Sequence, residues 1–167
     1  TSSGGGRPGS VPPAMSPPGT TDTTAADTRS GGEDGCIFCA IIAGATPAEI
    51  LDSDEHTLAF MDINPATRGH ALVIPRRHSA DLTAIPAEDL ERCAVAAQRL
   101  THRMRATLAP DGFNLINACG SLAWQTVFHF HIHVIPRYAD DPLKLPYIPR
   151  GGDMDEIART AAQIRGE

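Results

Sequence analysis

The spacing of hydrophobic and polar positions changes several times along the chain, and each change predicts an element. Apolar residues at three- and four-residue spacing follow Pro86 as far as Leu108, which predicts one long helix that ends at residues 110–112. Short apolar runs bounded by Gly, Pro or polar turns predict strands. These runs are residues 50–51 and 57–62, which suggest a hairpin, then 70–74, 113–117 and 127–135. Short helices are expected at residues 37–43 and 153–164.

This pattern also indicates the fold class. Strands outnumber helices and do not alternate with them regularly, so we expect an α+β domain in which one main helix packs across a small antiparallel sheet. Within that helix, the buried stripe is expected to include Cys93, Ala94, Ala97, Leu100 and Met104.

The chain divides into three regions. Gly, Pro, Ser and Thr dominate residues 1–35, which hold too few large apolar residues to offset the entropy of ordering them, so a disordered tail is expected. Residues 36–138 form the predicted folded domain, and residues 139–167 form an extension with a short helix.

Composition excludes several classes of protein. The net charge is −6, and an acidic chain is a poor general binder of nucleic acid. No stretch approaches the roughly 20 apolar residues of a membrane span. Four cysteines do not make a disulfide scaffold in a chain of this size, and the C-x-x-C of Cys36 and Cys39 favours metal or redox chemistry. We therefore expect a soluble cytoplasmic protein without a nucleic-acid or membrane partner.

Three histidines carry most of the chemical information. His129, His131 and His133 alternate with apolar residues, so a strand would place all three on one face, about 6–7 Å apart, and would turn Phe128 and Phe130 toward the core. Such a face suits two chemistries, a three-histidine catalytic zinc site or nucleophilic attack on phosphorus.

The residues around this strand favour the second chemistry. In the loop before it, backbone N–H groups, the Gln125 amide and the Thr126 hydroxyl can bind an oxyanion. Four arginines near the two apolar strands add a local basic bias that is consistent with a phosphorylated substrate: Arg68, Arg76, Arg77 and Arg137.

These motifs together resemble the histidine triad family of nucleotide hydrolases and transferases. The resemblance runs through the C-x-x-C, FMDINP at 60–65, RGHALVIPRRH at 68–78, DGFN at 111–114, QTV at 125–127 and the histidine strand. It implies a HIT-like fold, a homodimer formed through the main helix and adjoining strands, and a purine mononucleotide or dinucleotide substrate. Adenosine phosphoramidates and dinucleoside polyphosphates are the implied substrate types.

The resemblance also implies residue roles. It makes His131 the nucleophile that attacks the α-phosphorus and becomes a transient nucleotidyl-histidine. The remaining assignments are phosphate contact by His133, support by His70, contacts to phosphate and leaving group by Gln125 and Thr126, and ribose binding by Asp62.

A zinc ion is expected at a separate place. Cys36 and Cys39 suit two tetrahedral ligands, and the resemblance adds His78 and His129 to complete a structural Cys₂His₂ site. A closed site leaves no open coordination position for catalysis, so the zinc would fix the N-terminal helix and the catalytic strand. A reduced, metal-free C-x-x-C is the alternative.

Two positions depart from the family pattern. Trp124 stands where members usually have Gly, and Ala118 stands where Asn or Gln is common. These departures leave open a nucleotide-binding or regulatory module with vestigial catalysis. A third hypothesis is a zinc hydrolase that uses all three strand histidines.

Overall fold

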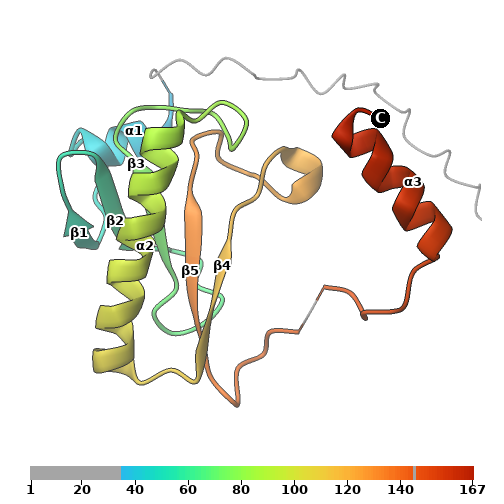
Figure 1. Ribbon diagram of the computed structural model, residues 1–167. Helices are drawn as coiled ribbons and strands as arrows, with labels where there is room; N and C mark the ends of the chain where they lie inside the picture. The colour runs from blue at the N-terminus through green and yellow to red at the C-terminus, as the bar shows by residue number, and fades with distance from the viewer. Residues whose placement is uncertain (1–34, 145) are drawn as a thin grey trace, which may run out of the picture.

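The computed structural model describes residues 35–144 and 146–167, so the predicted tail lies outside the described residues except for Gly35. Every expected helix and strand is present in the expected order (Figure 1). The elements are α1 (Ile37–Ile42), β1 (Ile50–Ser53), β2 (Thr57–Met61), β3 (Ala71–Pro75), α2 (Ala87–Leu108), β4 (Gly112–Ile116), the 3₁₀ turn η1 (Ser121–Ala123), β5 (Ile132–Arg137) and α3 (Met154–Arg165).

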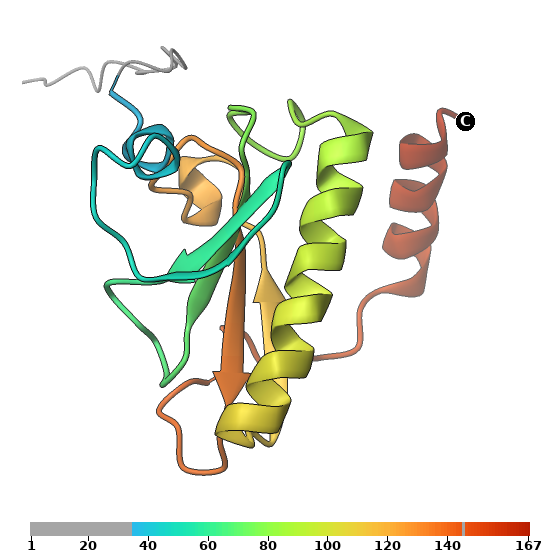
Figure 2. The ribbon, with the colours of Figure 1, turned by 90° about the vertical axis from the view of Figure 1, so that its left-hand side faces the viewer.

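The five strands form one antiparallel sheet in the order β1-β2-β3-β5-β4, and α2 crosses one of its faces (Figures 1 and 2). In this register, Leu72 of β3 lies opposite Phe60 of β2 and His133 of β5. The predicted fold class, a small antiparallel sheet with one main helix across it, is confirmed.

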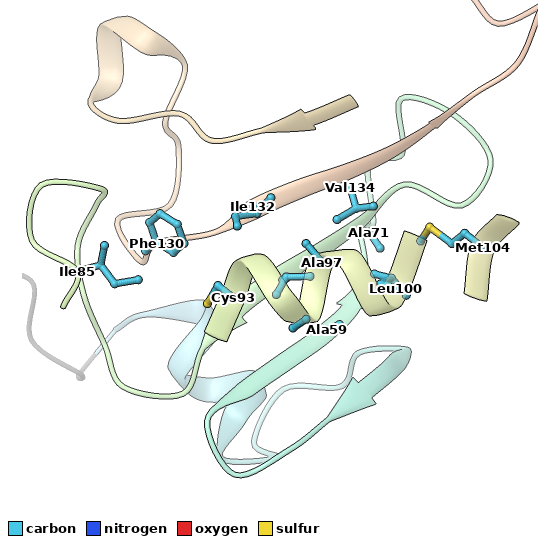
Figure 3. Packing of buried hydrophobic residues seen from close by; sticks show 12 residues of the cluster. Ala59, Ala71, Ile85, Cys93, Ala97, Leu100, Met104, Phe130, Ile132 and Val134 are labelled. Carbon is cyan, nitrogen blue, oxygen red and sulfur yellow. The ribbon is translucent and has the colours of Figure 1, made fainter. Parts of the chain in front are cut away.

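Apolar side chains pack on both faces of the sheet, because alternate residues of each strand point to opposite sides. On one face, Cys93, Ala97 and Leu100 of α2 pack against strand residues such as Ile132 and Val134 (Figure 3). The second cluster holds α1 against the other face and consists of Phe38, Leu58, Phe60, Leu72 and Ile74. The C-x-x-C is therefore fixed on the side of the sheet opposite α2.

The predicted stripe of α2 is nearly correct. Cys93, Ala97, Leu100 and Met104 are buried, but Ala94 is exposed and Ala96 is buried in its place. The reason is helical geometry, because each residue is rotated about 100° from the one before it. Position 94 therefore turns away from the face that position 93 presents to the sheet.

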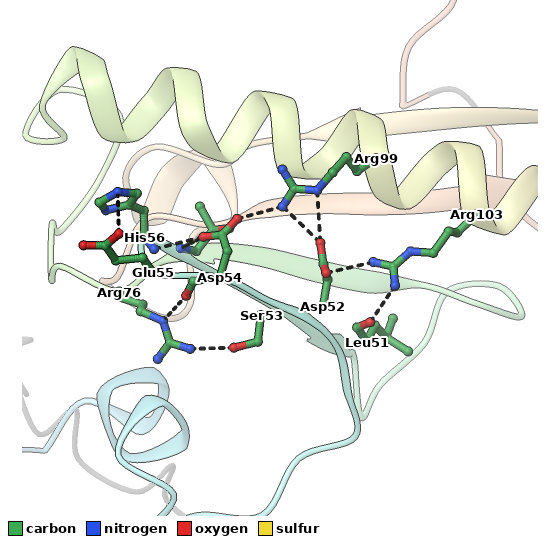
Figure 4. Close-up of polar contacts among 10 residues, drawn as sticks. Leu51, Asp52, Ser53, Asp54, Glu55, His56, Arg76, Arg99 and Arg103 are labelled. Atoms are coloured by element: carbon green, nitrogen blue, oxygen red, sulfur yellow. Dashed lines mark hydrogen bonds and ion pairs between the residues drawn. The ribbon is translucent and has the colours of Figure 1, made fainter.

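The β1–β2 hairpin is tied to α2 through charged side chains (Figure 4). The Asp54 carboxylate accepts hydrogen bonds from the backbone N–H of Thr57 and from Arg99, at 2.7 and 2.8 Å. Partial burial raises the pKa of Asp54, but its hydrogen bonds outweigh this effect and lower the pKa to about 2. Arg103 donates to the Leu51 carbonyl and pairs with Asp52.

The histidine strand begins later than predicted. β5 starts at Ile132 rather than at residue 127, and Phe128 is exposed instead of lying in the core. β3 itself runs on to Pro75, but its pairing with β5 ends where Val73 lies opposite Ile132. The Phe130 N–H donates instead to the Ser79 carbonyl in the loop after β3. His129 and His131 are thus held by a loop, and only His133 lies on the strand.

The C-terminal helix stands apart from the sheet in both views (Figures 1 and 2). The Asp153 carboxylate accepts from the backbone N–H groups of Asp155 and Glu156, so Asp153 is the N-cap of α3. No residue of α3 is buried. No helix in residues 35–144 or 146–167 is long and apolar enough to cross a membrane.

Candidate functional site

The four predicted zinc ligands come together. Cys36 and Cys39 lie at the start of α1, His78 lies in the loop after β3, and His129 precedes β5. His129 Nδ1 is 3.6 Å from both sulfurs, and His78 Nδ1 is 3.3 Å from Cys39 Sγ. Bonds of about 2.3 Å to sulfur and about 2.0 Å to nitrogen put such atoms about 3.5 Å apart around a tetrahedral zinc. The four side chains therefore have the spacing of a closed Cys₂His₂ site.

A hydrogen bond prepares His129 for this role. Its Nε2 lies 2.9 Å from the Pro75 carbonyl oxygen, which can only accept, so the ring proton is on Nε2. The lone pair on Nδ1 then faces the two sulfurs. Burial, together with the nearby imidazoles of His78 and His131, lowers the pKa of His129 to about 4. The ring is neutral at physiological pH, as a metal ligand must be.

His131 is the other tautomer from His129, with its proton on Nδ1 rather than on Nε2. Its Nδ1 is 2.7 Å from the His129 carbonyl oxygen, so Nδ1 carries the proton and Nε2 keeps a lone pair. The ring packs edge-on against Phe38, with centroids 5.3 Å apart. Burial lowers the pKa of His131, which keeps the imidazole neutral. A buried, neutral ring with one fixed lone pair has the properties of a nucleophile.

His70 and His133 form a hydrogen-bonded chain. The backbone N–H of Ala66 donates to His70 Nδ1 at 3.0 Å, so the proton of the neutral His70 ring is on Nε2. That nitrogen lies 2.9 Å from His133 Nδ1 and donates to it. The proton of His133 is therefore on Nε2. Burial and the imidazoles of His131 and His70 lower the pKa of His133 to about 4, so this ring is a neutral donor.

The ligand atoms of Asp62, His70 and His133 are also close enough together to bind a metal, but the position of the ring proton of His70 disfavours one. Asp62 Oδ2 lies 3.4 Å from His70 Nε2 and 3.8 Å from His133 Nδ1, distances that a zinc ion could span. The Ala66 N–H occupies the lone pair of His70, so the nitrogen facing Asp62 carries a proton. His129, His131 and His133 thus have three separate environments, which disfavours the hypothesis that they share one zinc.

A cavity of about 350 Å³ opens beside these histidines. Asp62, Thr126, His131 and His133 line its polar part. Its apolar part is lined by residues of α1, β2 and the following loops, including Phe38, Ile41, Pro47, Phe60 and Ile63. The cavity therefore joins an apolar slot to a cluster of polar groups, a common form for a small-molecule site.

The Gln125 amide, which was expected to contact phosphate and the leaving group, bonds to backbone groups in this structure. It is buried, its Oε1 accepts from the Gly120 N–H, and its Nε2 donates to the carbonyls of Ala80 and Val127. The amide does not line the cavity and acts as a brace for the loop that presents Thr126. Phosphate binding by Gln125 remains a prediction.

Asn117 lies next to Ala118, the position where family members often have Asn or Gln. Its Nδ2 donates to the His131 carbonyl at 2.9 Å, so it supports the backbone of the central histidine. The sequence carries no signal for this contact, because it depends on the pairing of β4 with β5.

The four arginines do not line the cavity described above. Arg76 bonds Ser53, Arg77 pairs with Glu88 and Asp89, and Arg137 pairs with Asp141. The expected link between these arginines and phosphate is therefore not supported, and the polar end of the cavity is lined by His131, His133, Asp62 and Thr126 instead.

Trp124 keeps the backbone conformation that suits a glycine. Its φ is 72°, in the left-handed region, and its indole is 73% exposed. The bulky residue therefore leaves the loop backbone in place, and the side chain projects into solvent rather than into the cavity.

A family model, the HIT domain, matches residues 43–140. The chain belongs to the HIT family. The match spans most of the described fold, from the end of α1 to the residues that follow β5.

Three solved HIT structures share the fold. A zinc-bound histidine triad family protein from Mycobacterium smegmatis is 41% identical, covers 81% of this chain and 99% of its own, and has a TM-score of 0.65. A histidine triad nucleotide-binding protein from Candida albicans is 30% identical, with coverage of 78% and 95% and a TM-score of 0.71. A HIT family hydrolase from Legionella pneumophila is 30% identical, with coverage of 66% and 97% and a TM-score of 0.57.

Proposed function

We propose that this HIT protein cleaves the bond between the α-phosphorus and the leaving group of a purine nucleotide, through a nucleotidyl-histidine on His131. The observation that carries this proposal is the fixed lone pair on Nε2 of a buried, neutral imidazole beside an open cavity. One structural relative is named as a hydrolase and another as nucleotide-binding, which agrees with the proposal.

The cavity fits the parts of a nucleotide. The apolar slot near Phe38 and Ile41 takes the base, and the Asp62 carboxylate beside it accepts hydrogen bonds from the ribose hydroxyls. The α-phosphate then lies at the polar end, where His133 Nε2–H and the Thr126 hydroxyl are donors. Adenosine phosphoramidates and dinucleoside polyphosphates both present these three parts.

Two displacements complete the reaction. The His131 lone pair attacks phosphorus and forms the N–P bond, while the bond to the leaving group breaks and that group takes a proton from water. The Nδ1–H bond to the His129 carbonyl stabilises the positive charge on the ring, and His133 donates to a phosphoryl oxygen. Water then attacks phosphorus and loses a proton, and the N–P electron pair returns to Nε2 with release of the nucleoside monophosphate.

We further propose that zinc binds Cys36, Cys39, His78 and His129 and has a structural role. The ligands join α1 to the two loops that hold the catalytic histidines, so the metal would stabilise the site without touching substrate. Reduced thiols are needed for this ligand set, which fits the cytoplasm.

A homodimer is also proposed, through β4 and the exposed side of α2. β4 is one of the two outer strands of the sheet, and it carries Leu115 and Ile116, which are both about half exposed. Val95 of α2 is likewise exposed. An apolar edge strand without a partner favours pairing with a second copy. Leu115→Asp should therefore halve the mass measured by light scattering.

The test of the chemistry is intact-mass spectrometry during turnover of adenosine phosphoramidate. The wild type and His133→Ala should each gain the mass of one AMP transiently, and His131→Asn should not. Binding of AMP by calorimetry without any adduct or AMP release would favour the alternative, a nucleotide-binding module with vestigial catalysis. An adduct that persists in His131→Asn would contradict the assigned nucleophile.

A further inference from the structure

The C-terminal helix has an apolar face with nothing against it in the described chain. Met154, Ile157, Ala161 and Ile164 follow a three-four-three spacing and share one side of α3. Met154 is 72%, Ile157 50% and Ile164 82% exposed. An isolated helix of twelve residues is only marginally stable in water. Packing of its apolar face against another surface would therefore stabilise α3.

A groove of matching character lies on the same side of the sheet as α2. Its volume is about 410 Å³, and it runs between the β1–β2 hairpin and the C-terminal half of α2. The apolar lining comes from Leu51, Met61, Leu100, Met104 and Leu108. It lies on the opposite face of the sheet from α1, and Met61 is the one lining residue that it shares with the cavity beside the histidines.

Charge at the rim of this groove complements the start of α3. Arg68 and Arg103 lie along the rim, and Arg103 is already paired with Asp52 (Figure 4). Arg68 has no ion-pair partner within the described residues. α3 brings Asp153, Asp155 and Glu156 to its first turn. A helix that enters with its N-terminus near Arg68 would pair these charges while its apolar face covers the groove.

The position of α3 points to the groove of a second copy. Figure 1 places α3 beyond β4, on the far side from the chain's own groove, and Figure 2 places it on the α2 side of the sheet. Hydrogen bonds from Arg137 to Asp141 and Leu143 fix the start of the extension. When β4 pairs with β4 of a second copy, an element that projects past this edge lies over the neighbouring sheet.

We propose that two copies exchange their C-terminal helices, each α3 seating its Met154–Ile157–Ile164 face in the groove between α2 and the β1–β2 hairpin of the other copy. This inference rests on the proposed homodimer and is independent of the His131 chemistry. The exchange closes the apolar groove and adds a second contact to the β4 edge.

Cross-linking between two distinguishable copies tests the exchange. One copy carries Thr107→Cys at the groove and an affinity tag, and the other carries Ile157→Cys, both in a zinc-loaded Cys119→Ser background. A short bismaleimide should join the two copies. The matched control replaces Ile157→Cys by Arg159→Cys, which lies on the polar side of α3 and should give at least about tenfold less product.

Two results would overturn the proposal. Equal product from Arg159→Cys and Ile157→Cys would mean that the apolar face does not dock. A Thr107→Cys/Ile157→Cys chain that closes on itself at high dilution, with no product between copies, would seat α3 in its own groove.

Light scattering separates this failure from failure of the chemistry. Ile157→Asp/Ile164→Asp should raise the dimer dissociation constant at least about tenfold, whereas Arg159→Asp should leave it nearly unchanged. A wild-type monomer with normal AMP release would overturn the exchange and the dimer but leave the His131 chemistry standing. An unchanged dimer in the double variant would overturn the exchange alone.

Discussion

The fold contains two clusters of residues that commonly bind metals, and His129 of one is only four positions from His133 of the other. Only one of the two clusters has its ring protons arranged for a metal. In the first, Cys36, Cys39, His78 and His129 face one another, and the bond from His129 Nε2 to the Pro75 carbonyl turns a lone pair toward the sulfurs. In the second, Asp62, His70 and His133 are equally close. There the Ala66 N–H turns a proton, not a lone pair, toward the centre.

The comparison teaches that distance between ligand atoms is a weak criterion for a metal site. Both clusters satisfy it, and one backbone contact in each decides the outcome. A carbonyl oxygen that accepts from one ring nitrogen leaves a lone pair on the other, as a metal ligand requires, whereas an amide N–H that donates to one ring nitrogen leaves a proton on the other. Variants of the two clusters should therefore fail in different ways, one in stability and the other in turnover.

The largest expected effect is on turnover and comes from His131→Asn. The loss of the nucleophile should lower the rate of AMP release from adenosine phosphoramidate by about 10³-fold or more. Zinc content and Tm should stay close to wild type, because His131 belongs to neither ligand set. Loss of zinc from the His131→Asn variant would contradict the claim that His131 acts independently of the zinc cluster.

Removal of the metal should act on stability. Cys36→Ser, or chelation, should cost about 3 kcal/mol of unfolding free energy and lower Tm by about 10 °C. The rate per folded molecule should change far less. Cys119→Ser is the matched control, since this thiol is half-buried and lies outside the cluster, and it should keep both zinc and Tm. A chelated protein with full stability would argue for a metal-free C-x-x-C.

His70 tests the donor chain. His70→Leu removes the hydrogen bond that fixes the His133 proton on Nε2, and the rate should fall by about 10- to 100-fold. His70→Gln keeps an N–H near the same place and should recover most of the rate. Zinc content should be the same in both. If the two variants are equally slow, His70 supports the fold rather than the His133 tautomer.

The smallest effect is a pH dependence of stability. The His133 pKa is about 4 in the fold and 6.5 when unfolded, so below pH 6.5 the unfolded chain takes up a proton that the folded chain refuses. The free energy of unfolding should therefore fall as the pH drops from 6.5 toward 4. Urea titrations of wild type and His133→Gln should show a shallower fall in the variant. Parallel curves would contradict the lowered pKa.

The sequence predicts the elements and the grouping of the four proposed zinc ligands well, because both depend on local spacing and on motifs. It fails where the answer depends on a neighbouring strand. The early start assigned to the histidine strand assumes that alternation means pairing. The pairing of β5 with β3 instead ends at Ile132 and Val73, the Phe130 N–H bonds the Ser79 carbonyl, and residues 127–131 lie in a loop. The three histidines consequently do not share one strand face.

Tertiary hydrogen bonds are the other limit. The sequence identifies His70 as a supporting residue but contains nothing that gives its tautomer, which an N–H four positions earlier decides. Likewise, Gln125 and Asn117 have the right chemistry to bind phosphate. The fold instead directs them to backbone partners, Gln125 to Gly120 and Ala80 and Asn117 to His131.

The carbonyl of His129 has a consequence for how such proteins can diverge. The ring of this residue faces Cys36 and Cys39 in the proposed zinc site, but its contact with His131, the proposed nucleophile, is made by a main-chain oxygen, which any amino acid supplies. Substitution of the four ligand side chains can therefore remove the metal while the hydrogen bond that orients His131 is inherited unchanged. Metal dependence and catalytic chemistry are thus free to evolve separately, although they meet at a single residue.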